Sequence, residues 1–353
     1  MKQAFANFQV RALAAALPAQ RQELLALAPE FNMAPEELAR ILATTGIRTV
    51  RVAPPEVCAS DLCAAAANQI FAATGLSGGD CDALVFVSQT GDYRLPATAC
   101  LLQHRLGLGR DAATFDLNSG CTGFIHALFQ AGLLLAAGAA RRVLVCAGDT
   151  TTRLIHPQDK SVRLIFGDAG AAALVESAAA DSAPAGFTLH ADGAGAKQLI
   201  IPAGGCRQPA TAATAQATPD DSGNLRSPQH LFMDGMEIMN FTLREVPPLV
   251  GEALAQAGWS AAETELFLLH QANKFILDCL RKKMRLPPEK VPVLMGETGN
   301  TGPASIPLAL CQLQPPPGQR RKVLLCGFGV GLTWGAATLD LGASQILPPI
   351  DLP

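Results

Sequence analysis

The sequence predicts a duplicated α/β fold, in which two related halves each combine mostly parallel strands with helices. The segments "RRVLVCAGDT", which starts at Arg141, and "RKVLLCGFGV", which starts at Arg321, share a basic pair, an apolar run, a cysteine and glycines. Each follows another continuous apolar run, "DALVFVSQTG" in one case and "ELFLLHQANK" in the other. Such runs are typical of buried parallel strands. We therefore expect an N-terminal half over residues 1–180 and a C-terminal half over residues 181–353.

The helices expected between these strands follow two loops at equivalent positions in the halves. When Ser88 is aligned with His270, two further loop residues come close to register, Cys121 and Asn300. The apolar stretches "FIHALFQAGLLLAAG" and "ASIPLALCQL" come soon after these two residues and predict helices that pack on the sheets. The segment Ala210–Ser227 is small, polar and rich in turn residues, so it predicts a surface loop.

The composition is that of a globular protein with a large core. Of the 353 residues, 49% are hydrophobic and 16% are charged, and the formal net charge is -3. This balance predicts no general attraction to nucleic acid or to anionic lipid. The ten cysteines are scattered singly, without a CxxC pair or zinc-ligand spacing, so we expect reduced thiols, no metal site and a cytoplasmic location. The apolar run Leu128–Ala140 is too short to span a bilayer, and we expect no membrane partner.

Three polar residues and one glycine-rich tail are candidates for chemistry. Cys121 in "NSGCTGF" is either a buried structural thiol or a nucleophile whose pKa is lowered by the start of the following helix. His270 in "LFLLHQAN" is either a hydrogen-bonded core histidine or a site residue at the carboxyl edge of a sheet. Asn300 in "GETGNTGPASIP" taken alone is a turn residue. The tail Gly327–Gly335 is either a tight turn or a loop that presents a backbone N–H group to an oxyanion.

Together these segments resemble β-ketoacyl-acyl carrier protein synthase III, a family of condensing enzymes with the thiolase fold. The motifs "DLNSGCTGF", "LFMDGMEIM", "LLHQANKFIL", "GNTGPASIPLAL" and "GFGVGLTWGAATL" occur in the order and at the spacing of that family, and the resemblance covers nearly the whole chain. It implies an α/β thiolase fold whose two duplicated halves pack as a five-layer αβαβα sandwich.

The resemblance also implies a reaction, the decarboxylative Claisen condensation that initiates fatty acid biosynthesis and gives a 3-oxoacyl-acyl carrier protein. Cys121, in the N-terminal half, would take the acyl group from an acyl-coenzyme A or acyl-carrier protein donor. His270 and Asn300, in the C-terminal half, would donate hydrogen bonds to the thioester carbonyl of malonyl-acyl carrier protein and to the enolate formed from it. The backbone N–H groups of Cys121 and Val330 would hold a second oxyanion, and no cofactor would be required.

Five further positions concern the donor and the carrier protein, and two of them depart from the pattern of the family. Arg40 and Lys160 stand where family members often clamp the adenine of coenzyme A between Trp and Arg. We also expect Asn273 to contact the pantetheine arm of the donor. The basic pair Lys282 and Lys283 matches a carrier-protein contact of the family, although a solvated helix end is the simpler interpretation.

Leu95 stands where the family often has a larger residue that reaches the acyl pocket of the partner subunit. We therefore expect a homodimer with Leu95 in that pocket, while a plain interface leucine is the alternative.

Two other functions stay open. A relative in a specialised polyketide or alkylquinolone-type pathway would use the same three residues on a longer or aromatic acyl group. A non-catalytic thiolase-fold subunit would only bind a carrier protein, but it would have no reason to keep all three.

Overall fold

The first sheet contains the strands predicted for the N-terminal half. The computed structural model describes residues 1–178, 182–314 and 321–353. The strands of this sheet are β2 (Gln9–Pro18), β5 (Ala83–Val87), β6 (Ala113–Leu117), β7 (Arg142–Asp149), β8 (Ala169–Glu176), β17 (Gln345–Ile346) and β18 (Ile350–Leu352). Their order is β17-β2-β8-β7-β5-β6, and β18 also pairs with β2. β5 is parallel to β6 and β7, whereas β8 is antiparallel to both β7 and β2.

The second sheet repeats this arrangement. Its strands are β1 (Lys2–Phe5), β9 (Ala185–Ala191), β14 (Leu266–Leu269), β15 (Lys322–Gly329) and β16 (Thr333–Asp340), in the order β1-β9-β16-β15-β14. β14 is parallel to β15 as β5 is to β7, and β16 is antiparallel to β15 as β8 is to β7. The terminal strands exchange, because β1 joins the second sheet while β17 and β18 join the first. The predicted division between residues 180 and 181 lies outside the described residues and stays a prediction.

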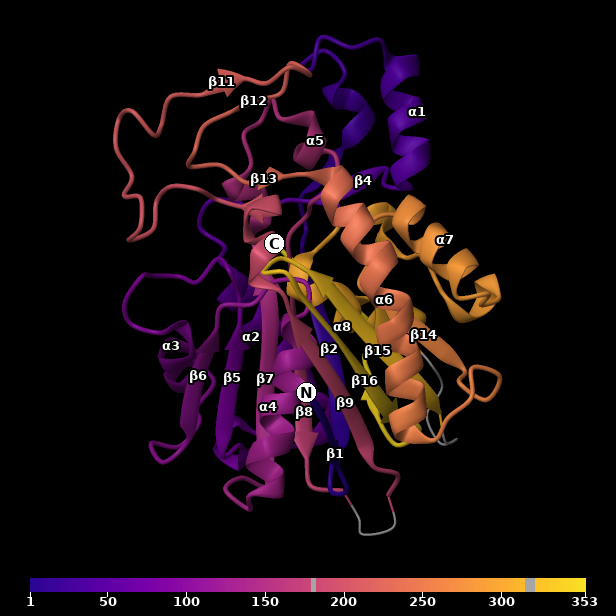
Figure 1. The fold of residues 1–353 in the computed structure, drawn as a ribbon. Helices are drawn as coiled ribbons and strands as arrows, with labels where there is room; N and C mark the ends of the chain where they lie inside the picture. Colours follow the sequence, from indigo (N-terminus) through magenta and orange to yellow (C-terminus); the bar gives the residue numbers. More distant parts are fainter. Residues whose placement is uncertain (179–181, 315–320) are drawn as a thin grey trace.

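The helices and sheets form five layers (Figure 1). The helices α4 (Gly123–Ala136) and α8 (Ser305–Leu313) lie between the sheets and contact strands of both. α2 (Ala59–Thr74) and α3 (Thr98–Arg105) cover the outer face of the first sheet. α6 (Gly235–Ala257) covers the outer face of the second sheet, beside α7 (Lys274–Lys283). This αβαβα order confirms the fold class predicted from the sequence.

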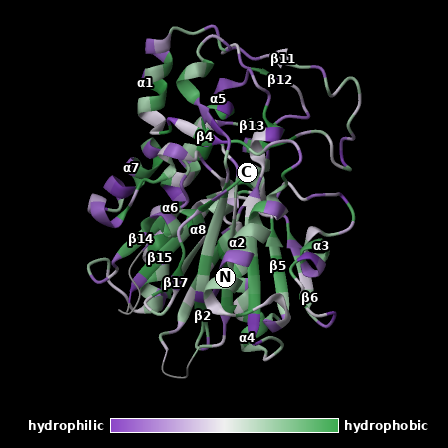
Figure 2. Ribbon diagram, turned by 180° about the vertical axis from the view of Figure 1, so that it is seen from behind, coloured by the Kyte–Doolittle hydropathy of each residue, from purple (hydrophilic) through white to green (hydrophobic). Residues whose placement is uncertain are grey.

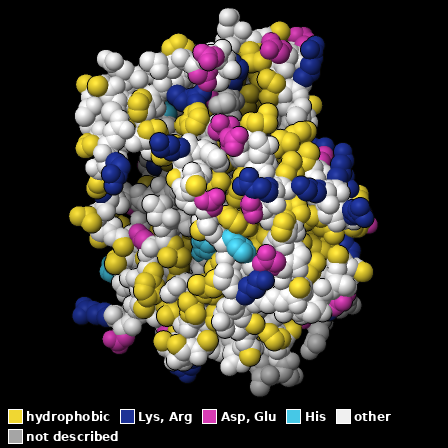
Figure 3. All heavy atoms as spheres, viewed as in Figure 1, with side chains coloured by type: hydrophobic (Ala, Val, Ile, Leu, Met, Phe, Trp, Pro, Cys, Tyr) yellow, Lys and Arg dark blue, Asp and Glu magenta, His cyan; other side chains and the backbone are white. Residues whose placement is uncertain are grey.

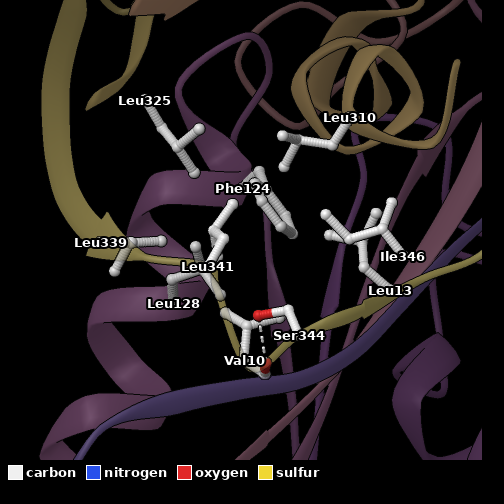
Figure 4. Close-up of a pocket in the computed structure, with 10 residues that line it drawn as sticks. All are labelled: Val10, Leu13, Phe124, Leu128, Leu310, Leu325, Leu339, Leu341, Ser344 and Ile346. Carbon is white, nitrogen blue, oxygen red and sulfur yellow. Dashed lines mark hydrogen bonds between the residues drawn. The ribbon is translucent and has the colours of Figure 1, made fainter. Parts of the chain in front are cut away.

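The middle helices are apolar because both of their faces are buried. Figure 2 shows hydrophobic residues along the strands and hydrophilic residues concentrated on the outer segments such as α1 (Pro35–Thr45) and α7. In one part of the core, side chains from α4, α8, both sheets and the C-terminal tail converge (Figure 4). The Ser344 hydroxyl donates to the Val10 carbonyl oxygen there, at 2.6 Å. The remaining space has no room for a water molecule, so it is packed core rather than a binding site.

Short elements cover the carboxyl ends of the parallel strands. They are β3 (Arg21–Glu23), β4 (Thr49–Arg51), α5 (Lys160–Arg163), β10 (Leu199–Ile200), β11 (Thr218–Pro219), β12 (Leu225–Arg226) and β13 (Phe232–Met233). The predicted surface loop 210–227 is mostly exposed and carries the β11-β12 hairpin. Within the three described ranges, no helix is long and apolar enough to cross a membrane.

Candidate active site

Cys121, His270 and Asn300 meet at one cavity of about 180 Å³. Cys121 follows β6, His270 follows β14, and Asn300 lies in the loop before α8. All three residues are buried, with exposed fractions of 8%, 1% and 4%. The two halves therefore contribute to one site, because both set their loops at the carboxyl ends of parallel strands.

The Cys121 thiol lies within reach of two backbone donors, one from each half. Burial raises the pKa of Cys121 to about 12, and the Asp149 carboxylate contributes in the same direction. Hydrogen bonds from the backbone N–H groups of Cys121 and Val330 lower the pKa, but by less. The pKa of Cys121 in the free chain is therefore raised, opposite to the lowered pKa expected for a nucleophile at the start of a helix. Burial and the Asp149 carboxylate outweigh the two backbone hydrogen bonds. The Cys121 thiol is therefore protonated near neutral pH.

The loop that carries Val330 has a backbone conformation that its glycines permit. Gly329 has φ 153° and Gly331 has φ 135°, whereas Val330 itself does not have a positive φ. A Cβ atom on Gly329 would lie 3.1 Å from both Cβ and Sγ of Cys121. The loop is tied to the start of α4, because the Thr122 hydroxyl donates to the Thr333 carbonyl oxygen at 3.0 Å. Glycines on both sides thus bring the Val330 N–H against the thiol while Val330 keeps ordinary geometry.

The His270 imidazole is neutral and held on one side. Its backbone N–H donates to the Cys326 carbonyl oxygen at 2.7 Å, which continues the pairing of β14 with β15. Its Nδ1 atom lies 2.6 Å from the Ser305 hydroxyl oxygen, and the Phe328 ring lies edge-on at 5.5 Å between centroids. Burial lowers the pKa of His270 to about 3. The imidazole is therefore a neutral hydrogen-bonding group near pH 7.

The Asn300 side chain is oriented by its own loop. The Asn300 backbone pairs with the 165–167 segment, since its N–H donates to the Ile165 carbonyl oxygen at 2.8 Å and its carbonyl accepts from the Gly167 N–H at 3.0 Å. The side-chain oxygen Oδ1 accepts from the Gly302 N–H at 3.0 Å. Because Oδ1 is occupied, the Nδ2 amide is the group left to donate to a ligand.

A second cavity of about 270 Å³ lies on another side of Cys121. Its polar lining comes from Gln89, Asn118, Asp149 and Thr151, and the rest of its lining is mostly apolar. Asp149, at the end of β7, accepts hydrogen bonds at Oδ1 from Ser88, Gln89 and Thr90. Burial raises the pKa of Asp149 to about 6 in spite of these bonds. The thiol thus separates two cavities of different character.

Known proteins are similar to this chain in sequence and in fold. The family model for 3-oxoacyl-[acyl-carrier-protein (ACP)] synthase III matches residues 115–197, and the model for its C-terminal part matches residues 254–341. A beta-ketoacyl-[acyl-carrier-protein] synthase III of Streptomyces coelicolor is 37% identical over 305 residues, which cover 85% of this chain and 88% of the relative. The chain belongs to the 3-oxoacyl-[acyl-carrier-protein] synthase III family.

Two crystal structures of 3-oxoacyl-(acyl-carrier protein) synthases agree with this assignment. A 3-oxoacyl-(acyl-carrier protein) synthase from Burkholderia xenovorans LB400 is 38% identical, has a TM-score of 0.92, and covers 100% of this chain and 99% of its own. A 3-oxoacyl-(acyl-carrier-protein) synthase III solved at 2.1 Å is 40% identical, has a TM-score of 0.90, and covers 95% of this chain and 99% of its own. The likeness therefore extends over the whole synthase III fold.

The donor residues predicted for this synthase III chain lie at different places. Asn273 lines the first cavity, and its Oδ1 accepts from the Ile276 N–H at 2.9 Å and so caps α7. Arg40 is exposed on α1, and the Lys160 ammonium donates to the Ser222 carbonyl oxygen at 2.8 Å. Neither Arg40 nor Lys160 lines the two cavities beside Cys121.

The surface residues predicted for this synthase III chain are exposed. Leu95, in the loop between β5 and α3, has an exposed fraction of 85%, and it lines neither cavity of its own chain. Lys282 and Lys283 are exposed at the end of α7, where Figure 3 shows Lys and Arg side chains gathered.

The sequence analysis did not identify three residues that lie near the site. Ser305, Phe328 and Asp149 contact His270 or affect the Cys121 pKa, but all three lie inside apolar or small-residue runs. Only the position of Asp149 at the end of an apolar strand offered a signal. Over the described ranges, no group of three or more His, Cys, Asp or Glu side chains is arranged to hold a metal ion.

Proposed function

We propose that this chain condenses an acyl thioester with malonyl-acyl carrier protein, with loss of CO₂, to give a 3-oxoacyl-acyl carrier protein. The observation that carries the proposal is the meeting of Cys121, His270 and Asn300 at one cavity, with the His270 imidazole neutral and the Asn300 amide oriented as a donor. The membership of the synthase III family supports the same reaction.

The first step loads the acyl group on Cys121. The sulfur attacks the carbonyl carbon of the donor thioester, the new C–S bond forms, and the C–S bond to the donor thiol breaks. The proton lost by Cys121 balances the proton taken up by the departing thiolate. During attack the carbonyl oxygen becomes an oxyanion, for which the N–H groups of Cys121 and Val330 are the available donors. Because the thiol begins protonated, proton removal is part of the cost of this step.

The second step makes the carbon nucleophile. The bond between the malonyl carboxylate and the methylene carbon breaks, CO₂ leaves, and the electron pair moves toward the thioester oxygen as an enolate. Hydrogen bonds from His270 Nε2 and Asn300 Nδ2 stabilise that oxygen without a charged partner. The enolate carbon then attacks the acyl-Cys121 carbonyl, and the C–S bond to Cys121 breaks. The released thiolate takes a proton from solvent, which restores the starting enzyme.

We place the acyl group of the donor in the cavity of about 270 Å³, and the pantetheine arm in the cavity that Asn273 lines. Arg40 and Lys160 lie outside both cavities, so they are candidates only for contacts with the end of a long donor that is distant from the thioester.

The proposed homodimer rests on a different region. The edge strand β6 is largely exposed, as are Tyr93 and Leu95 in the loop beside it. An exposed edge strand is a natural place for a second copy to pair.

A second candidate is a type III ketosynthase of specialised metabolism, and one observation favours it. The proposed acyl cavity includes Gln89, Asn118, Asp149 and Thr151, so part of its wall is polar. A donor acyl group that carries a hydrogen-bonding substituent would use this wall, whereas a saturated chain would leave it unpaired.

Mass spectrometry of the protein after incubation with a panel of donors tests both candidates. We expect one acyl mass on Cys121 in the wild type and a graded dependence on chain length. If Leu95 of the partner subunit closes the cavity, Leu95→Phe shifts loading toward shorter acyl groups, because one or two methylenes are worth about 1 to 3 kcal/mol in an apolar pocket. Leu25→Phe, at another exposed leucine, is the matched control. An unchanged profile in Leu95→Phe would contradict the assigned role of Leu95.

We also propose Lys282 and Lys283 as part of the docking surface for the acidic carrier protein, on the basis of their exposure at the end of α7. Changing both to Glu is expected to raise KM for malonyl-acyl carrier protein, more strongly at low salt, because exposed charges act mainly on encounter. If the double variant and the wild type have the same KM at low salt, Lys282 and Lys283 do not belong to the docking surface and are simply a solvated helix end.

A further inference from the structure

We infer that Ser305 is a positioning residue that fixes the tautomer of His270, so that the imidazole presents an N–H group to the reacting thioester. The inference deepens the proposed function, on which it rests, and it concerns a residue that touches no substrate. It starts from the 2.6 Å contact between the Ser305 hydroxyl oxygen and His270 Nδ1.

A neutral imidazole carries one proton on either of its two nitrogens, and only one arrangement suits the reaction. Burial keeps His270 neutral, since its pKa is lowered to about 3. With the proton on Nε2, the ring donates to a carbonyl or enolate oxygen in the cavity. With the proton on Nδ1, the ring offers a lone pair to the same oxygen and repels it. The chemistry of His270 therefore depends on what bonds to Nδ1.

The surroundings of Ser305 decide the direction of that hydrogen bond. Ser305 is 2% exposed, and in the part of the chain that the structure describes its hydroxyl has no partner besides His270 Nδ1. If Nδ1 carried the proton and donated, the Ser305 O–H would be buried without an acceptor, which is costly. If the Ser305 O–H donates to Nδ1, both groups are satisfied. The second arrangement is the stable one, and it leaves the imidazole proton on Nε2.

The same short segment also orients the other donor. Asn300 and Ser305 stand at the two ends of one loop and helix start, with the 3₁₀ turn Gly302–Ala304 between them. The Gly302 N–H in this turn holds Asn300 Oδ1, and Ser305, the first residue of α8, holds His270 Nδ1. One segment thus directs both N–H donors into the cavity, although His270 itself comes from β14.

The direct test is ¹⁵N nuclear magnetic resonance of protein labelled at histidine, which distinguishes a protonated from an unprotonated ring nitrogen. The chain has six histidines, and the His270 signals are those missing from His270→Ala. We expect an unprotonated Nδ1 and a protonated Nε2 in the wild type near pH 7. A protonated Nδ1 in the wild type overturns the inference, whatever the activity of any variant.

Kinetics test the consequence. In Ser305→Ala we expect CO₂ release from malonyl-acyl carrier protein to fall about tenfold, the effect of losing one ordinary hydrogen bond. Loading of Cys121 should stay unchanged, because it uses the backbone donors instead. Ser305→Thr keeps the hydroxyl and should restore most of the rate. An unchanged rate in folded Ser305→Ala would overturn the inference.

A matched control is Thr301→Val, which removes another buried hydroxyl of the same segment. In the described ranges, the Thr301 hydroxyl has no hydrogen-bond partner, so its loss should not change either half-reaction. Thermal unfolding of each variant separates a folding defect from a kinetic one. Failure of the proposed function has a different signature, namely an unacylated Cys121 in the wild type, while the tautomer measurement does not require turnover.

Discussion

The loops that carry Cys121 and Asn300 occupy equivalent positions in the two halves, yet they are built differently. The Cys121 loop follows a regular strand, since β6 pairs with β5 in parallel register over five residues, from Ala113 to Leu117. The segment 286–299 before Asn300 is fully described and has only 3₁₀ turns, and Asn300 makes a single bridge to Phe166 of the other half.

This difference decides which groups each loop offers. At Cys121, the donors are its own backbone N–H group and that of Val330, which lies in the loop between β15 and β16. At the Asn300 loop, the backbone N–H and carbonyl are used by Ile165 and Gly167, and the side-chain amide is free to donate. Backbone donors survive most substitutions, whereas a side-chain donor is lost with one. The two positions therefore offer hydrogen-bond donors that differ in their sensitivity to mutation.

The largest expected effect is that of Cys121→Ala. Without the sulfur there is no acyl-enzyme, so acyl loading and condensation should both be abolished. Intact-protein mass spectrometry with peptide mapping checks this. Cys100 and Cys206 are exposed and could give a slow background, so Cys100→Ala is the matched control and should load normally. An acyl group retained at wild-type rate by Cys121→Ala would show that another residue is the nucleophile.

The next effect separates the two sites. His270→Ala and Asn300→Ala should each slow malonyl decarboxylation roughly a hundredfold, because one preorganised donor to an oxyanion typically contributes on the order of 3 kcal/mol. Both variants should still load Cys121, since the backbone site is intact. Single-turnover CO₂ release from preloaded enzyme and the rate of acylation measure the two halves separately. Equal losses in both half-reactions would mean that the sites are not independent.

A smaller effect is expected where the backbone site can be disturbed, at Gly329. The added Cβ in Gly329→Ala would lie 3.1 Å from Cys121 Cβ and Sγ, in a conformation with φ 153°. A shift of the loop would move the Val330 N–H group away from the thiol. Extra bulk in a packed site typically costs about 1 to 3 kcal/mol, so we expect acyl loading to slow about tenfold. Gly193→Ala, where an added Cβ meets nothing, is the control. Full loading activity in Gly329→Ala would show that the loop adapts.

The smallest effect is an expected absence of pH dependence. Because burial lowers the pKa of His270 to about 3, the imidazole stays neutral between pH 5 and 8 and should add no titration to CO₂ release from preloaded enzyme over that interval. Asp149, beside Cys121, has a pKa of about 6, so the measurement is made in Asp149→Asn as well. A decline with a midpoint near 6.5 in both proteins would mean that His270 is charged in the working enzyme.

The same pKa affects stability, with a definite sign. The folded-state pKa of His270 lies below the ordinary value of 6.5, so the unfolded chain binds the extra proton first as the pH falls. The stability contributed by keeping His270 neutral is present above about pH 6.5 and is lost as the pH falls toward 3. Denaturant unfolding should therefore show a shallower acid decline in His270→Ala than in the wild type.

The sequence by itself determined the architecture, and it singled out Cys121, His270 and Asn300, which the structure brings to one cavity. The apolar runs of β5, β7, β14 and β15 predicted parallel strands, because only strands buried on both faces are apolar throughout. Their repetition predicted the duplication, and the spacing set Cys121 and Asn300 at matching loops. These features are local in the chain or periodic along it, so they can be read without coordinates.

The tertiary structure decided what depends on neighbours distant in the chain. It reversed the expected direction of the Cys121 pKa, because burial and Asp149 outweigh the backbone hydrogen bonds of Cys121 and Val330. It placed Ser305 against His270, thirty-five residues away, and it left Arg40 and Lys160 outside the cavities. It also exchanged the terminal strands between the sheets. The hydration of a thiol, the tautomer of a histidine and the access of a side chain to a cavity depend on the groups that surround it in space. Sequence spacing does not encode those surroundings.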